Sequence, residues 1–190
     1  MRTKHVMVLA AVLGLASSQL AMADPTALDL AKKGNDYVGV QSKDKVLKIY
    51  SDKSVASLEP NIWYVVYYDP DIFQKTAEVK FGAGQEIEVS RSMRPFQMPA
   101  KARDILDMSK VTVDSDRALK VAQEQPLLKG LTLRYSKMTL ADTDNGMAWK
   151  IELWAAKVND PTKTASIGTI YISATDESVL RSDLHPDRAT

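Results

Sequence analysis

The sequence predicts an α+β protein built from two small tandem units, each with a helix packed on an antiparallel β-sheet. Three observations lead to this fold class. Strand-like runs rich in β-branched and aromatic residues recur along the chain. A helix-like segment precedes the strands in each half. Finally, a short motif that begins with a tryptophan occurs in both halves, which is typical of an internal repeat.

In the first unit, expected over residues 24–96, the pattern predicts one helix and four strands. Apolar residues at helical spacing predict a short helix over 25–33, which Gly34 ends. The run 62–68 is β-branched and aromatic on both faces and predicts a central strand. The other strands are expected over 46–50, 77–81 and 86–89, the last two forming a hairpin.

A proline-marked linker over 97–114 is expected to follow, with a short helix from 100 to 108. The second unit is expected over 115–182, where Asp114 can cap a helix that reaches about Gln125. Its strands are expected over 131–135, 149–153, 165–174 and 179–180, with a tight turn at Asn145-Gly146. A polar tail over 183–190 ends the chain.

The motif shared by the two halves indicates a duplication. Its members are Trp63, Asp69-Pro70 and the Lys-Thr-Ala of 75–77 in the first half, and Trp149, Asp160-Pro161 and the Lys-Thr-Ala of 163–165 in the second. The tryptophans are 86 residues apart and the Lys-Thr-Ala segments 88 apart, so only a short indel separates the halves. The alternative is chance, because tryptophan in strands and Asp-Pro in turns are common.

The composition excludes several classes of protein. The chain has 190 residues, with 25 Lys and Arg, 24 Asp and Glu, and no cysteine. A net charge of +1 argues against a dedicated nucleic-acid-binding protein, which carries a strong basic excess. Without cysteine there is no disulfide, thiolate zinc site or cysteine nucleophile. With only two histidines, His5 and His185, a histidine-rich metal centre is also excluded.

The first 23 residues predict a cleaved signal peptide. Arg2 and Lys4 form a positive start, and the apolar run 6–16 that follows has 11 residues. A membrane-spanning helix needs about 20 residues, so an uncleaved N-terminal anchor is the less favoured alternative. The small-x-small pattern over 21–23 predicts cleavage after Ala23.

Cleavage would release an exported protein into the periplasm or the medium. No later stretch reaches transmembrane length, so we expect no membrane span after cleavage. Loss of Arg2 and Lys4 leaves 23 basic and 24 acidic residues, a net charge of −1. With no disulfide available, the mature chain must be held together by packing alone.

The second half resembles the PepSY family of exported α+β domains. The matching segments are a helix over 115–122, an aromatic strand over 148–153 and a terminal hairpin over 171–180. Ser173 stands where the family usually has Asp, and Asp176 where it has a turn Gly. The first half matches more loosely. The resemblance implies a cystatin-like helix on an antiparallel sheet, and a non-catalytic role in binding or inhibiting peptidases or in envelope interactions.

Aromatic side chains are the candidate binding residues: Trp154, Tyr64, Tyr68, Trp63 and Tyr67. One face of strand 62–68 must be core, either the Trp63 and Tyr67 face or the Tyr64 and Tyr68 face. The other face offers an aromatic surface for a peptide or glycan, unless both faces are buried. Trp154 lies opposite Trp149 in the strand alternation, which favours an exposed contact.

No catalytic residue, metal ligand or cofactor is expected from the motifs. Counted from Asp142, the acidic turn lacks the Glu that an EF-hand needs at its twelfth position. No serine lies in Gly-x-Ser-x-Gly. We therefore expect a non-catalytic protein that binds a peptide or protein partner in the cell envelope, with a peptidase as one candidate. The alternatives are an envelope enzyme or accessory subunit with an unrecognised carboxylate site, and a glycan or small-molecule binder.

Overall fold

The computed structural model describes residues 24–91 and 99–190. The predicted signal peptide over 1–23 lies outside the described residues, as does the start of the predicted linker up to residue 98. Within the two described ranges, no helix has the length and apolar character needed to cross a membrane.

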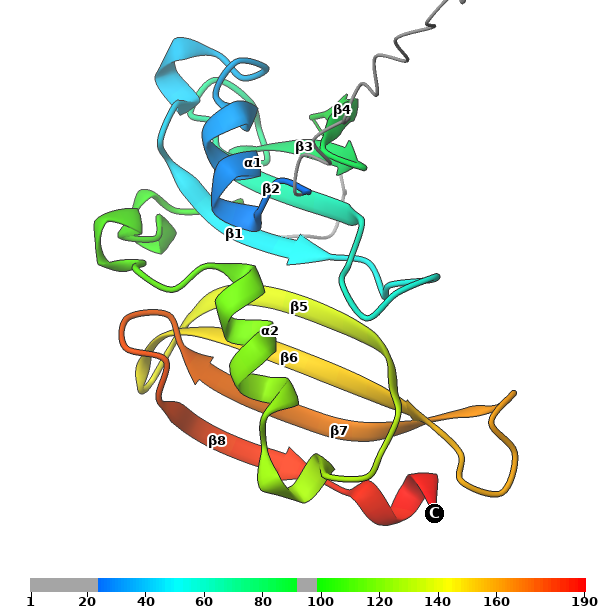
Figure 1. Cartoon of the computed structure of the whole chain (residues 1–190). Helices are drawn as coiled ribbons and strands as arrows, with labels where there is room; N and C mark the ends of the chain where they lie inside the picture. Colours follow the sequence, from blue (N-terminus) through cyan, green and yellow to red (C-terminus); the bar gives the residue numbers. More distant parts are fainter. Residues whose placement is uncertain (1–23, 92–98) are drawn as a thin grey trace, which may run out of the picture.

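The described residues form eight β-strands, two α-helices and five short 3-10 helices (Figure 1). The strands are β1 (Val46–Ser51), β2 (Ile62–Tyr68), β3 (Thr76–Gly82), β4 (Gln85–Ser90), β5 (Leu133–Thr143), β6 (Gly146–Ala156), β7 (Thr164–Ser173) and β8 (Val179–Leu184). The α-helices are α1 (Ala27–Gly34) and α2 (Ser115–Gln123). The 3-10 helices are η1 (Val40–Ser42), η2 (Ala102–Asp104), η3 (Met108–Lys110), η4 (Pro126–Leu128) and η5 (Pro186–Ala189).

All eight strands belong to one antiparallel sheet with the order β4-β3-β2-β1-β5-β6-β7-β8. The expected fold of two tandem units, each a helix on its own cystatin-like sheet, is therefore wrong. The sheet is continuous because β1 pairs with β5, where Ile49 lies opposite Leu140 and Tyr50 opposite Thr139. In two separate sheets, both of these strands would be edges with unpaired backbone groups. Here the backbone groups of β1 and β5 form hydrogen bonds with each other.

We call this junction, together with the residues just after β1, the seam. It holds only two pairs of facing residues in regular register, and serine hydroxyls extend it. The Met138 N–H donates to Ser51 Oγ at 2.9 Å, and the Ser136 N–H donates to Ser54 Oγ at 3.0 Å. Both accepting serines are buried. Their hydroxyls thus replace the carbonyl acceptors that a longer β1 would supply to β5.

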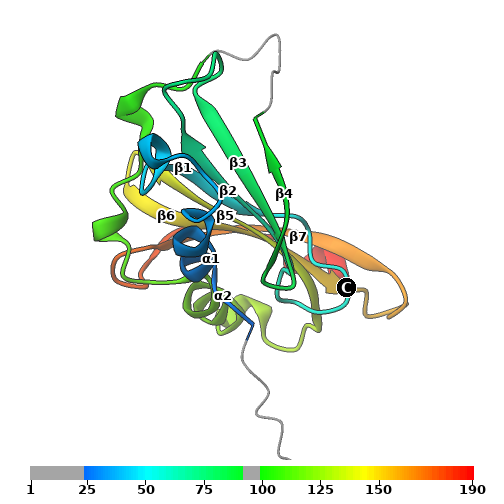
Figure 2. The ribbon, with the colours of Figure 1, turned by 90° about the horizontal axis from the view of Figure 1, so that it is seen from above.

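Both α-helices lie on the same face of the sheet (Figures 1 and 2). Helix α1 packs on β1 and β2, and α2 packs on β6 and β7. Beneath them, one row of directly facing apolar residues crosses all eight strands: Val89, Val79, Val65, Ile49, Leu140, Trp149, Ile172 and Val179. The six inner members are fully buried, so the register places one continuous core under both helices.

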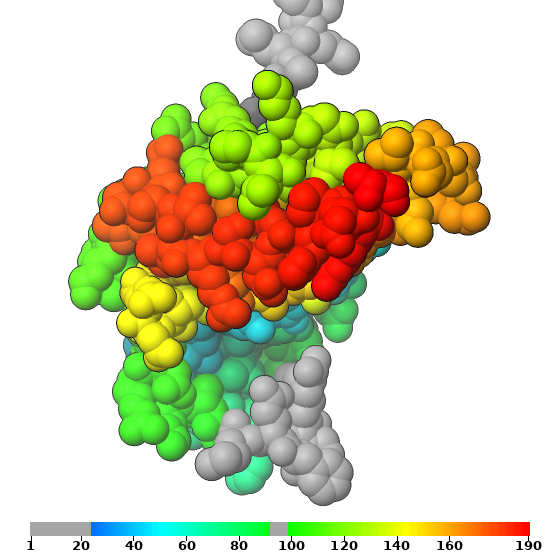
Figure 3. Space-filling model, turned by 90° about the horizontal axis from the view of Figure 1, so that it is seen from below, coloured from blue at the N-terminus to red at the C-terminus, as the bar shows by residue number. Residues whose placement is uncertain are grey.

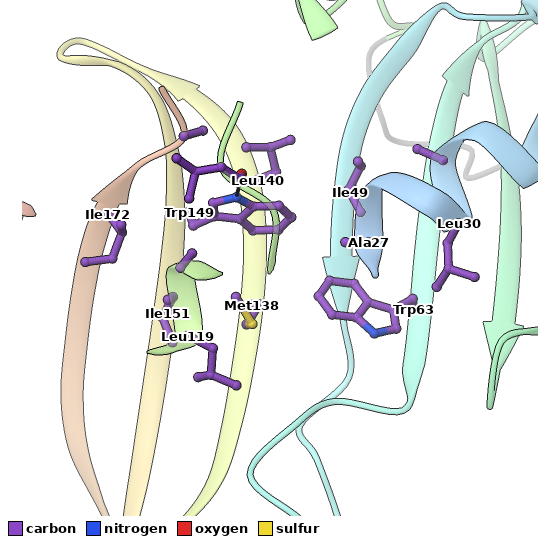
Figure 4. Packing of buried hydrophobic residues seen from close by; sticks show 14 of the residues in the cluster. Ala27, Leu30, Ile49, Trp63, Leu119, Met138, Leu140, Trp149, Ile151 and Ile172 are labelled. Carbon is purple, nitrogen blue, oxygen red and sulfur yellow. Dashed lines mark hydrogen bonds between the residues drawn. The ribbon is translucent and has the colours of Figure 1, made fainter. Parts of the chain in front are cut away.

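The core is continuous across the seam. Trp63 of β2 and Trp149 of β6 meet edge to face, with ring centroids 6.3 Å apart (Figure 4). Each indole N–H is paired: that of Trp63 donates to the Pro60 carbonyl at 3.0 Å, and that of Trp149 to the Val113 carbonyl at 2.8 Å. Both tryptophans of the shared sequence motif are therefore core residues.

The N-termini of the two helices are joined by one acidic side chain. Asp114 caps α2 by accepting from the Ser115 N–H at 2.6 Å, and it also accepts from the Leu28 N–H of α1 at 3.2 Å. The Ser115 hydroxyl accepts from the Ala27 N–H at 3.0 Å. Amide donors at the start of both helices thus find partners in α2 and its cap.

Several predicted elements are confirmed, among them the first helix and the strand over 62–68. A tight turn also joins β5 to β6, but it lies at Asp144-Asn145, one residue before the predicted Asn145-Gly146, and Gly146 begins β6. The predicted helix over 100–108 is wrong, because the segment forms only η2 and the start of η3. Its amides are used elsewhere: the Ala100 N–H donates to the Gln74 carbonyl at 3.2 Å, and the Leu106 N–H to the Val46 carbonyl at 2.8 Å. Residues 183–190, predicted as a polar tail, contain the end of β8 and η5.

Candidate functional site: the helix-free face of the sheet

The sheet face opposite α1 and α2 carries no α-helix among the described residues, and we call it the helix-free face (Figure 2). One row of directly facing residues crosses all eight strands on it: Glu88, Lys80, Tyr64, Tyr50, Thr139, Lys150, Tyr171 and Arg181. We call these residues the polar row. Every member is half-buried or exposed. With neighbouring strands about 4.8 Å apart, the row spans about 34 Å.

The structure separates the predicted binding residues of β2 into two groups. Trp63 and Tyr67 face the helices and are buried, and the Tyr67 hydroxyl donates to the Ala31 carbonyl at 2.6 Å. Tyr64 and Tyr68 are half-buried on the opposite face. Of the two alternatives left open by the sequence, the Trp63 and Tyr67 face is therefore the core.

Two tyrosines form the centre of the polar row. The rings of Tyr50 and Tyr64 are stacked, with centroids 4.7 Å apart and an angle of 7° between their planes. The Tyr50 hydroxyl donates to Glu78 Oε2 at 2.8 Å, and the Tyr64 hydroxyl donates to Asp52 Oδ2 at 3.0 Å. Partial burial, followed by the hydrogen bond to Asp52, raises the pKa of Tyr64 above its ordinary value. Carboxylates thus hold both rings in fixed orientations.

Cations lie over several aromatic rings on this face. Lys48 Nζ lies 4.9 Å from the Tyr50 ring centroid, and Lys80 Nζ lies 5.4 Å from that of Tyr64. At the other end of the row, the Arg181 guanidinium lies 5.9 Å from the Tyr171 ring. These distances fall within the range of cation–π attraction. The face is therefore aromatic but not purely apolar, because charged groups lie over its rings.

Trp154 lies on the same face beside Tyr135, its direct neighbour across β5 and β6. It is half-buried, and Lys53 Nζ lies 4.4 Å from its ring centroid and 4.7 Å from that of Tyr135. The ring predicted as an exposed contact is thus covered by a lysine of the same chain. Tyr50, Tyr135 and Tyr171 were not among the predicted binding residues, although the alternation of polar and apolar residues in β7 could have pointed to Tyr171.

A groove of about 530 Å³ lies beside the polar row. Its floor includes Tyr50, Val66 and Glu78 on the helix-free face, and its wall includes Lys101 and Asp104. The wall is fixed locally because Asp104 Oδ2 accepts from the Lys101 N–H at 3.0 Å. A volume of this size matches pockets that take a small molecule or a few side chains.

The outer edges of the sheet are charged. The edge strand β8 runs along the surface (Figure 3) and carries the exposed residues Arg181 and Asp183. At the other edge, β4 carries Glu86 and Glu88. Charged side chains on an edge strand are a common protection against the addition of further strands. The face of the sheet is therefore a better binding surface than its edges.

Within residues 24–91 and 99–190, no group of three or more His, Asp or Glu side chains is arranged to hold a metal ion. His185 Nε2 lies 3.1 Å from Asp183 Oδ1 at the end of β8. Comparisons with protein-family models, curated proteins and solved structures give no match to this chain.

Proposed function

We propose that this chain is an exported, non-catalytic binding protein that holds a peptide, or a peptide segment of a protein partner, on its helix-free face. The observation that carries the proposal is the polar row. It brings three tyrosines and three cations into one line across the sheet, with no α-helix of the described residues over them. Tyrosine supplies a large contact area and a polar tip while losing little conformational entropy on binding.

The fixed orientation of the rings supports binding. The hydroxyls of Tyr50 and Tyr64 are already bonded to Glu78 and Asp52, so the rings need not be ordered by a ligand. A preorganised surface binds more tightly than one that must be ordered at the moment of contact. The groove at Tyr50 adds a hollow in which a side chain of the ligand can lie.

The chemistry of the groove favours binding over catalysis. A carboxylate-based active site pairs an acid and a base in a concave pocket and shifts their pKa values. Of the two carboxylates that line the groove, Glu78 accepts from the Tyr50 hydroxyl and Asp104 from the Lys101 N–H. Both therefore have positioning roles. The PepSY resemblance of residues 115–182, which remains a prediction, implies the same class of function.

A peptide-display selection against the purified protein tests the proposal. Selected peptides should bind a Tyr64→Ala, Tyr171→Ala double variant at least about tenfold more weakly, because two ring contacts of about 1 kcal/mol each are lost. The control is Leu127→Ala, which removes an exposed apolar side chain of η4, away from the helix-free face. Equal binding by the double variant and the wild type would refute the proposed surface.

Export is tested separately by identifying the N-terminus of the protein recovered from the producing cells. We expect a chain that begins at Asp24 and is found outside the cytoplasm. A chain that keeps Met1 and stays with the cytoplasmic fraction would contradict the export part of the proposal.

A further inference from the structure

The pair formed by Tyr135 and Trp154 differs from the other aromatic residues of the helix-free face. Its two rings come from adjacent strands and share one cation, Lys53, with ring centroids 4.7 and 4.4 Å from Nζ. Over the rest of the described chain, each cation–π contact on this face joins one cation to one ring. The pair therefore offers two rings within cation–π distance of one position, and Lys53 shows that an ammonium group fits there.

Lys53 is held at the rings by its side chain alone. Its neighbours in the chain are fixed independently, because Asp52 accepts from the Tyr64 hydroxyl and Ser54 bonds to Ser136 of β5. In the part of the chain that the structure describes, no carboxylate forms an ion pair with Lys53. Lys53 is exposed, and the four-carbon stem of a lysine side chain is flexible. The ammonium group can leave the rings while the backbone of the seam stays in place.

We propose that Tyr135 and Trp154 form a binding site for a guanidinium or ammonium side chain of the bound peptide, and that Lys53 fills this site until the peptide arrives. This inference rests on the proposed function, because the incoming cation belongs to the peptide. Exchange conserves the interaction type, since one cation–π contact pair is lost and another forms. Arginine is the favoured ligand because its planar guanidinium stacks on aromatic rings and is less strongly hydrated than an ammonium.

Tethering makes Lys53 a competitor of the incoming side chain. A group attached by a short flexible linker acts at an effective concentration in the millimolar range. Removing the lysine should therefore strengthen the binding of a free cation to the pair. Removing either ring should weaken it.

The test compares the wild type with Lys53→Ala, using N-acetylarginine amide as the probe and N-acetylcitrulline amide as its neutral isostere. The readout is the NMR signal of the Trp154 indole N–H, which is identified by its loss in Trp154→Phe. The indole signals of Trp63 and Trp149 report whether each variant keeps its core. Lys53→Gln repeats the removal of charge with a longer side chain.

We expect a saturable shift of the Trp154 signal in Lys53→Ala with the arginine probe, at a probe concentration lower than the wild type needs. The citrulline probe should give no saturable shift, and Tyr135→Ala in the Lys53→Ala background should abolish that of the arginine probe. No saturable response to arginine, an equal response to citrulline, or equal affinity in wild type and Lys53→Ala would overturn the inference. Those results would leave the Tyr64 and Tyr171 test intact, so the two proposals fail separately.

Discussion

The substitution Ser51→Ala tests whether serine hydroxyls hold β1 and β5 together at the seam. Ser51 is fully buried, and its hydroxyl is the acceptor for the Met138 N–H at 2.9 Å. Alanine leaves that buried amide without its partner. A buried polar group deprived of its hydrogen bond costs about 1–3 kcal/mol. For a domain whose total stability is about 5–15 kcal/mol, the expected loss is a substantial share.

Urea unfolding followed by tryptophan fluorescence measures the effect, because Trp63 and Trp149 are buried on either side of the seam. With a slope of about 2 kcal/mol per molar urea, a loss of about 2 kcal/mol lowers the midpoint by about 1 M. The matched control is Ser166→Ala, an exposed serine of β7, which should change stability by less than about 0.5 kcal/mol. Equal midpoints for the two variants would refute the assignment of Ser51 as an acceptor for β5.

Three further predictions concern other parts of the fold. Gly168→Ala should destabilise the protein by about 1–3 kcal/mol in the same urea assay, because its φ of +113° strains any side chain and the added Cβ would overlap the Asp183 carbonyl of β8; an unchanged midpoint would contradict this. Asp114→Ala should cost more than about 1 kcal/mol, since it removes an N-cap and the bond to the Leu28 N–H, whereas Asp114→Asn should retain most of the stability. Burial raises the pKa of Tyr67, so above about pH 10 the unfolded state loses this proton before the folded state does, and stability falls as the pH rises. Tyr67→Phe should be less stable than the wild type at pH 8, and the difference should shrink by pH 11; a difference that stays constant would exclude this linkage.

Local structure could be predicted well from local patterns. The β-branched and aromatic run over 62–68 forms β2 as expected, and the cap at Asp114 starts α2. The helix expected over 100–108 failed because its amides bond to distant carbonyls of Gln74 and Val46, which no local pattern reveals. Helical spacing alone therefore did not determine the secondary structure of that segment.

The continuous sheet could not be predicted for a related reason. It depends on the pairing of Ile49 with Leu140 and on the hydroxyls of Ser51 and Ser54, which read in the sequence as the end of one strand and the loop after it.

The candidate site was predicted in part. Tyr64 and Tyr68 lie on the helix-free face, as one of the two alternatives from the sequence had it. The contact of Lys53 with the Trp154 ring could not be predicted, because the two residues are about 100 positions apart in the sequence.

Hydroxyl-radical footprinting of the protein with a selected peptide bound tests the helix-free face as the binding surface most directly. The method reports side chains, so it can distinguish the two faces of one strand. We predict that the peptide protects Tyr64, Tyr171 and Trp154, while Tyr37, which contacts Phe81 of the core on the helix side, keeps its reactivity. Protection of Tyr37 with unchanged Tyr64 and Tyr171 would place the ligand on the helix side and contradict the proposed function.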